Sequence, residues 1–250
     1  MCLIAWNWQP HSRMPLVLVA NRDEFYARPA LAMHWWPGEQ VLAGKDLQAG
    51  GTWLGLSRNG RLAALTNYRS RNGLRACAPS RGTLVAAFLN RADSAMAFIQ
   101  DLQLSGVYYN PFNLLLFDGA TLMGFESSSA TTVRFQAGPG AVSNARFGTP
   151  WPKLLRLQEG LTSAIDTGNA NDAALWSLLQ DCTPAPDHLL PSTGISLEQE
   201  RTLSAPFTAS DGYGTRASSI VRISANGASA LETSYSPTGS VGQVAYAFAF

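Results

Sequence analysis

The sequence predicts an α+β fold in which mostly antiparallel sheets carry helices on their outer faces. Short apolar runs follow one another early in the chain, two helical segments come next, and strands, helices and strands complete the order. This order differs from the regular strand–helix alternation of a parallel sheet. Short turns between consecutive strands are typical of antiparallel pairing. Because no internal repeat or shift in composition divides the chain, we expect a single domain over residues 1–250.

The strands are predicted from short apolar runs that end at turn residues. The runs over 2–8 and 15–20 are separated by a break that contains Pro10, which indicates a hairpin or two neighbouring strands. The runs over 52–57 and 61–67 flank Asn59-Gly60, a strong hairpin signal. Further strands are expected at 113–118, 122–126, 132–135, 141–144, 217–223, 230–235 and 243–250. Pro and Gly residues predict irregular structure over 25–50.

The helices are predicted from the spacing of apolar residues. Residues 80–90, 93–102 and 173–179 fit a helical period. Pro152 suits the first turn of a third helix, in which Leu154, Leu157, Leu161 and Ile165 share one face. Residues 69–79 are polar and loop-like. Four of the 14 prolines fall within 183–212, where we expect a long loop of the kind that often carries function.

Composition and charge exclude several classes of protein. The net charge of +1 gives no strong field for nucleic acid. Three cysteines and three histidines form no metal-binding or disulfide spacing, so we expect no metal site. The chain has neither a signal-peptide pattern nor 18 consecutive apolar residues. We therefore expect a cytoplasmic protein without stable membrane insertion; the sequence leaves its oligomeric state open.

Cys2 follows the initiator Met1, and removal of Met1 would give it a free α-amine beside its thiol. A free α-amine titrates near pH ~7.7–8.0, in the working range of a general base. The thiol is intrinsically a strong nucleophile. One residue would then supply both nucleophile and base. The alternative is a chance small residue after Met1, or a cysteine buried in a first strand.

Polar residues at strand ends are the other candidates for chemistry. Arg22 and Asp23, after the second apolar run, would favour the Cys2 thiolate and orient its amine, or would belong to a solvated turn. Asn67 and Asn144 also end strands, where they would donate to an oxyanion or form turns. Arg216 would bind a carboxylate or phosphate, or lie on the surface.

Several motifs stand out along the chain: Met1-Cys2, Ala20-Asn21-Arg22-Asp23-Glu24-Phe25-Tyr26, Arg28-Pro29, Gly50-Gly51-Thr52-Trp53-Leu54-Gly55, Leu62-Ala63-Ala64-Leu65-Thr66-Asn67-Tyr68, Tyr109-Asn110-Pro111-Phe112-Asn113-Leu114, Ser143-Asn144, Thr149-Pro150-Trp151-Pro152-Lys153-Leu154 and Tyr213-Gly214-Thr215-Arg216. Together these segments resemble the NRDE family, also called the Transport and Golgi Organization protein 2 family. They appear in family order and span almost the whole chain.

The family in turn resembles the cysteine branch of the N-terminal nucleophile hydrolases, which implies a four-layer αββα sandwich. It implies hydrolysis of a linear amide or thioester of an acyl small molecule, without a cofactor. The implied catalytic residues are Cys2, Arg22, Asp23, Asn67, Asn144 and Arg216, and the implied substrate-binding residues are Asn21, Trp53, Tyr68 and Tyr213. Arg22 and Asp23 are adjacent here, whereas the acylase branch separates its Arg and Asp, so a strand would send them to opposite faces unless a bulge intervenes.

The resemblance also leaves a non-catalytic alternative. Family members are linked to haem and lipid handling, so the same cleft would carry a hydrophobic ligand without turnover. Haem would then use His34 or Cys2 as a ligand, although no spacing marks either residue.

Overall fold

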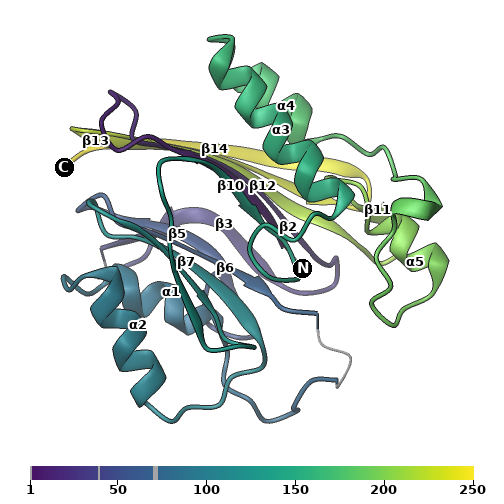
Figure 1. Cartoon of the computed structure of the whole chain (residues 1–250), viewed down its shortest axis with the longest axis horizontal. Coiled ribbons are helices and arrows are strands. Elements are labelled where there is room, and N and C mark those ends of the chain that lie inside the picture. Colours follow the sequence, from purple (N-terminus) through teal and green to yellow (C-terminus); the bar gives the residue numbers. More distant parts are fainter. Residues whose placement is uncertain (1, 39, 70–72) are drawn as a thin grey trace.

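The computed structural model describes residues 2–38, 40–69 and 73–250. Two sheets face one another in the middle of the molecule, and helices cover the outer side of each (Figure 1). Every strand pair in both sheets is antiparallel. The αββα sandwich of mostly antiparallel sheets is confirmed.

The first sheet contains the N-terminal strand. Its order is β10 (Gly138–Val142), β1 (Cys2–Trp8), β2 (Leu16–Phe25), β12 (Tyr213–Ser224), β13 (Gly227–Ser236) and β14 (Gly239–Ala249), and β11 (Ala209–Ser210) pairs with β12. Strand β1 lies in the interior of this sheet and is buried along its whole length. A strand that is covered on both faces favours a nearly continuous apolar run, and Asn7 is the one polar residue of 2–8.

The second sheet follows the order of the chain. It runs β3 (Ala30–Trp35), β4 (Val41–Asp46), β5 (Leu54–Ser57), β6 (Leu62–Asn67), β7 (Phe112–Phe117), β8 (Leu122–Glu126) and β9 (Thr131–Arg134). The turn between β5 and β6 contains Gly60 at a φ of 75°, a left-handed conformation that glycine adopts without a Cβ clash. The hairpin predicted from Asn59-Gly60 is confirmed.

The helices form the two outer layers. Helices α1 (Gly82–Leu89) and α2 (Ala95–Leu104) pack on the second sheet, and α3 (Pro152–Asp166) and α4 (Asp172–Leu179) pack on the first. Pro152 occupies the first turn of α3, and Leu154, Leu157 and Leu161 are buried, as their spacing predicts. Among the described residues, no helix combines the length and apolar character needed to cross a bilayer.

Alternation along β1 and β2 divides the core. Cys2, Ile4 and Trp6 belong to the cluster between the sheets, whereas Leu3 and Ala5 belong to the cluster under α3 and α4. The same division holds on β2, where even-numbered residues face the other sheet and odd-numbered residues face the helices. This alternation decides the direction of the polar side chains that end both strands.

Two of the predicted irregular segments contain regular structure. Residues 25–50 carry β3 and β4, because the prolines and glycines lie mostly between the strands rather than inside them. Residues 183–212 contain a 3₁₀ turn at Asp187–Leu189, helix α5 (Leu197–Thr202) and β11. A capping box in which Ser196 and Gln199 bond one another's backbone N–H starts α5. The predicted polar loop over 69–79 lies partly outside the described residues.

Several boundaries also differ from the predicted ones. Strand β2 extends to Phe25, so residues 21–24 belong to a strand rather than a solvated turn. Strand β12 begins at Tyr213, and β10 covers 138–142 instead of 141–144. In each case, pairing with a neighbouring strand continues through polar or glycine residues that the apolar pattern alone leaves out.

Candidate active site

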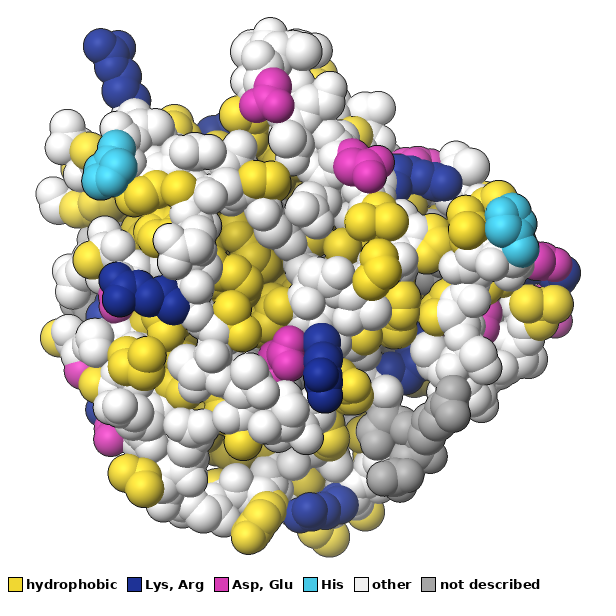
Figure 2. Space-filling view, in the orientation of Figure 1, with side chains coloured by type: hydrophobic (Ala, Val, Ile, Leu, Met, Phe, Trp, Pro, Cys, Tyr) yellow, Lys and Arg dark blue, Asp and Glu magenta, His cyan; other side chains and the backbone are white. Residues whose placement is uncertain are grey.

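A cleft of about 850 Å³ lies between the two sheets, with Cys2 in its wall. Its lining combines Arg22 and Glu232 of the first sheet with Asp46 and Asn67 of the second. Strands β1 and β6, from opposite sheets, approach one another in this region. Acidic and basic side chains are interspersed among apolar ones on the face shown in Figure 2.

Cys2 occupies the first position of β1, and only 6% of its surface is exposed. Its backbone carbonyl accepts a hydrogen bond of 3.2 Å from Oγ of Ser143, which ties the strand end to the segment after β10. Burial raises the pKa of the Cys2 thiol to about 11 in the chain that retains Met1, although the Arg22 guanidinium acts in the opposite direction. The thiol of that form is therefore protonated near neutral pH.

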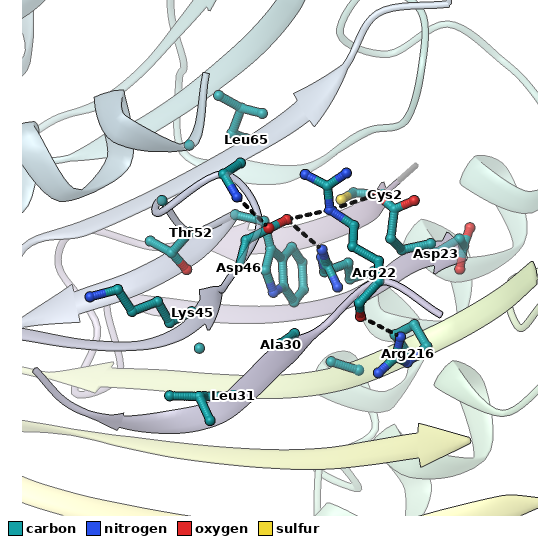
Figure 3. Close-up of a pocket in the computed structure, with 18 of the residues that line it drawn as sticks. Cys2, Arg22, Asp23, Ala30, Leu31, Lys45, Asp46, Thr52, Leu65 and Arg216 are labelled. Atoms are coloured by element: carbon teal, nitrogen blue, oxygen red, sulfur yellow. Dashed lines mark hydrogen bonds and ion pairs between the residues drawn. The ribbon is translucent and has the colours of Figure 1, made fainter. Parts of the chain in front are cut away.

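Arg22 pairs with Cys2 in the β1–β2 ladder and faces the second sheet. Its Nη2 atom lies 3.1 Å from Oδ2 of Asp46, and the same oxygen accepts a 2.6 Å bond from Nε of Arg28 (Figure 3). Burial raises the pKa of Asp46, but the bonds from Arg28 and from the backbone N–H of Ala49 outweigh it, so the pKa lies below its usual value. Asp46 is therefore a carboxylate that holds two cations, and one of them, Arg22, is the ladder partner of Cys2.

Asp23 comes directly after Arg22 on β2, on the face that alternation turns away from the second sheet. Its Oδ1 atom accepts a 2.8 Å bond from Oγ1 of Thr215, a neighbour on β12, and the residue is 1% exposed. Asp23 borders the cleft where β1 begins, and its carboxylate also raises the pKa of Lys153 in the first turn of α3. Arg22 and Asp23 thus lie on opposite faces, as the alternation of a strand requires.

Asn67 and Asn144 are linked to one another. Nδ2 of Asn144 donates a 2.8 Å bond to the backbone carbonyl of Asn67, and the Asn144 carbonyl accepts from the backbone N–H of Arg69. Asn67 lines the cleft, whereas Asn144 is 1% exposed and lies behind it. The geometry gives Asn67 access to a ligand and makes Asn144 its support.

Arg216 lies at a bulge in β12, where the pairing with β2 shifts between Thr215 and Ala217. Its Nη1 atom donates to the backbone carbonyls of Phe25, Tyr26 and Arg28 at 2.8–3.0 Å. Arg216 borders the cleft, but these bonds hold the turn that carries Arg28.

The four predicted substrate-binding residues occupy different places. Trp53 lines the cleft, whereas Asn21, Tyr68 and Tyr213 do not. The amide of Asn21 donates to the carbonyls of Leu179 and Pro206, so it joins β2 to the helical layer. The ring of Tyr213 packs on Phe25, and burial strongly raises the pKa of its hydroxyl.

A metal site in the part of the chain that the structure describes would require several ligating side chains close together. Within residues 2–38, 40–69 and 73–250, no three His, Cys, Asp or Glu side chains come together in a possible metal site. Nδ1 of His34 donates a 2.8 Å bond to the carbonyl of Ala32, and His34 is not among the residues that line the cleft.

Sequence reasoning missed three residues that shape the site. Asp46 lies at the end of β4, in the segment predicted to be irregular. Asn113 donates to Oγ1 of Thr66 and to the carbonyl of Ala145, which anchors the loop of Ser143 and Asn144. Glu232 reaches the backbone N–H of Met33 on the other sheet. The matching segment Asn110-Pro111-Phe112-Asn113 was a usable signal for Asn113; the other two depend on how the sheets stack.

Two facing antiparallel sheets with helices on both outer sides are the arrangement of the N-terminal nucleophile hydrolase fold. A solved structure of a Clostridium perfringens conjugated bile acid hydrolase mutant superposes with a TM-score of 0.57, covering 98% of this chain and 92% of that one at 8% identity. At this identity the likeness establishes the fold alone.

The chain belongs to the Transport and Golgi organisation 2 family, whose sequence profile matches residues 1–236. The Transport and Golgi organization protein 2 homolog of Bos taurus is 34% identical over 251 residues, which cover 91% of this chain and 90% of that protein. The human homolog is 32% identical over 249 residues with the same coverage.

Proposed function

We propose that the protein is a cysteine hydrolase that cleaves a linear amide or thioester of an acyl small molecule, with Cys2 as the nucleophile. The observation that carries this proposal is the position of Cys2, at the start of a buried strand and in the wall of a cleft between two sheets. The cleft volume of about 850 Å³ suits a small-molecule ligand. The bile acid hydrolase in the solved structure carries a C2A substitution, so that protein also has a cysteine at its second position.

The proposed reaction begins after Met1 has been removed. The Cys2 α-amine takes the thiol proton, and the sulfur attacks the acyl carbonyl to form an S–C bond. The C–N or C–S bond of the substrate then breaks, and the leaving amine or thiol receives the proton. Water hydrolyses the acyl-enzyme and releases the acid. The Arg22 guanidinium lowers the pKa of the thiol, so it favours the thiolate.

Asn67 is the proposed oxyanion donor. Asn67 lines the same cleft as Cys2, and its backbone is fixed by the bond from Asn144. Loss of one oxyanion donor typically lowers turnover by about 10²–10³-fold. We expect this loss in Asn67→Ala, measured as turnover with unchanged binding of a non-hydrolysable analogue. Turnover equal to that of the parent would remove Asn67 from this role.

The experiment that tests the activity uses protein whose first residue is Cys2. An acyl thioester and an acyl anilide of medium chain length are the probes, and intact mass reports the acyl-enzyme. We expect one acyl group per chain and product release, both abolished in Cys2→Ala. Cys182→Ala is the matched control, because Cys182 is exposed and does not line the cleft. Undiminished turnover in Cys2→Ala would refute the mechanism.

A second candidate is a non-catalytic carrier of haem or another hydrophobic ligand. The burial of Cys2 favours the carrier in the chain that keeps Met1, because the thiol is then protonated and is a weak nucleophile. The cleft of that form would bind a ligand without cleaving it. Titration with haem separates the two. A saturable Soret shift in protein that retains Met1, together with no acylation after Met1 removal, would support the carrier.

A further inference from the structure

Lys153 is a buried amine with no assigned role. It lies in the first turn of α3, is 2% exposed, and its Nζ atom has no hydrogen-bond partner among the described residues. A buried ammonium without a partner is costly, and a cation at a helix N-terminus opposes the helix dipole. Both effects favour the neutral amine.

Two of the titratable groups that act on Lys153, Asp23 and Cys2, line the candidate site. After burial, the Asp23 carboxylate on β2 has the largest effect on the pKa of Lys153, followed by Arg69 after β6, Cys2 on β1 and Glu200 on α5. Asp23 raises this pKa, but burial lowers it by a larger amount, so the pKa of Lys153 lies below its usual value. Glu200 is already paired with Arg69 at 3.1 Å, which leaves Asp23 as the carboxylate most strongly coupled to Lys153.

We propose that Lys153 is a positioning residue that accepts the proton of the Cys2 α-ammonium and so frees the Cys2 amine to act as base. This inference rests on the proposed function. One N–H bond of the ammonium breaks and one forms at Nζ of Lys153. The Asp23 carboxylate on β2, the strand beside β1, favours the charged form of Lys153 and would favour that of the Cys2 amine in the same way. The net charge of the site is unchanged by the transfer, so no co-reactant is needed.

The composition of the chain makes this proposal testable. Lys45 and Lys153 are the only lysines, so protein labelled with ¹⁵N at the lysine amines gives two side-chain resonances. Arg substitutions at each position assign them. We expect Lys153 to titrate below the ordinary lysine value of about 10.4, and Asp23→Asn to lower its pKa further. Glu159→Gln, which removes an exposed carboxylate from the same helix, should leave the Lys153 resonance unchanged.

A second readout links Lys153 to the thiol. In protein that starts at Cys2, we expect Lys153→Met to slow iodoacetamide alkylation of Cys2 at pH 7 by about tenfold, one pH unit in the profile. We expect the thermal midpoint to be unchanged or higher, because an apolar side chain replaces an unpartnered buried amine. A purely structural lysine would give the opposite pattern, lower stability and unchanged alkylation. Gln158→Met on α3 is the control.

The outcomes separate this inference from the proposed function. A Lys153 pKa at the ordinary value, or one that does not respond to Asp23→Asn, overturns the inference and leaves a Cys2 hydrolase intact. A lowered, Asp23-dependent pKa with slower alkylation in Lys153→Met supports it. Because alkylation needs no substrate, a failure to find turnover would refute the hydrolase without affecting this result.

Discussion

Removal of Met1 should change the reactivity of Cys2 by about two orders of magnitude. In the chain with Met1, burial raises the pKa of the thiol from 9.0 to about 11. At pH 8, a thiol with the first value is about one-tenth thiolate and one with the second about one-thousandth, a hundredfold difference equal to about 2.7 kcal/mol. A free Cys2 amine would remove this barrier by accepting the proton within the same residue.

The assay compares two chains that differ by one residue. Cys77 and Cys182 are replaced by serine, so that Cys2 is the sole thiol. One chain retains Met1, and a site-specific protease exposes Cys2 in the other. Iodoacetamide adducts are followed by intact mass from pH 6 to 10. The Met1-retaining chain unfolded in urea gives the rate of the unburied thiol.

Two results would refute the reasoning. If the folded chain with Met1 reacts as fast as the urea-unfolded chain, burial does not control the thiol. If the chain that starts at Cys2 reacts no faster than the chain with Met1, its amine is not the base. We expect a native-to-unfolded ratio of about 1:100 with Met1 at pH 8, and recovery of most of that factor without it.

Three further predictions concern stability. Burial raises the pKa of Glu232 from 4.5 to about 7. The contribution of Glu232 to the free energy of unfolding is therefore fully present below pH 4.5, and it is lost as the pH rises through 7. Between pH 4.5 and 8, the free energy of unfolding should fall by up to about 3 kcal/mol more in the parent than in Glu232→Gln, as measured by urea unfolding. An equal fall in both proteins would contradict this prediction. Arg216→Met should lower the free energy of unfolding by about 2–4 kcal/mol, because its bonds to carbonyls of residues 25–28 are lost, and Arg216→Lys should not restore it. Gly51→Ala should cost about 1–3 kcal/mol, since a Cβ would lie 2.4 Å from the Gly82 carbonyl carbon; an unchanged thermal midpoint would disprove the clash.

Local signals in the sequence were sufficient where one short segment determines the structure. The Asn59-Gly60 turn and the leucine spacing of α3 are examples, because turn conformation and helix periodicity are properties of neighbouring residues. Strands β3 and β4 were missed because prolines and glycines frame them and β3 is half exposed at a sheet edge. Helix α5 was missed despite its capping box, since the prolines around it indicated a loop.

The candidate site was only partly predictable, for a different reason. The position of Cys2 and its pairing with Arg22 follow from two adjacent apolar runs. Asp46 reaches Arg22 only because one sheet stacks on the other, and no local pattern encodes that contact. The bulge at Arg216 likewise depends on the register between β2 and β12, which are far apart in sequence.

The adjacency of Arg22 and Asp23 has a physical consequence for the mechanism. A single strand sends Arg22 toward Asp46 in the cleft and Asp23 toward Lys153 in the helical layer. Cys2 lies at the end of the neighbouring strand, with its thiol on the Arg22 side. The thiol and the amine would therefore be tuned by separate charges on opposite faces of one sheet. We expect Arg22→Met to slow alkylation of the Cys2 thiol without changing the Lys153 pKa. We expect Asp23→Asn to lower the Lys153 pKa. Equal effects of both substitutions on the Lys153 pKa would show that the two faces are not independent.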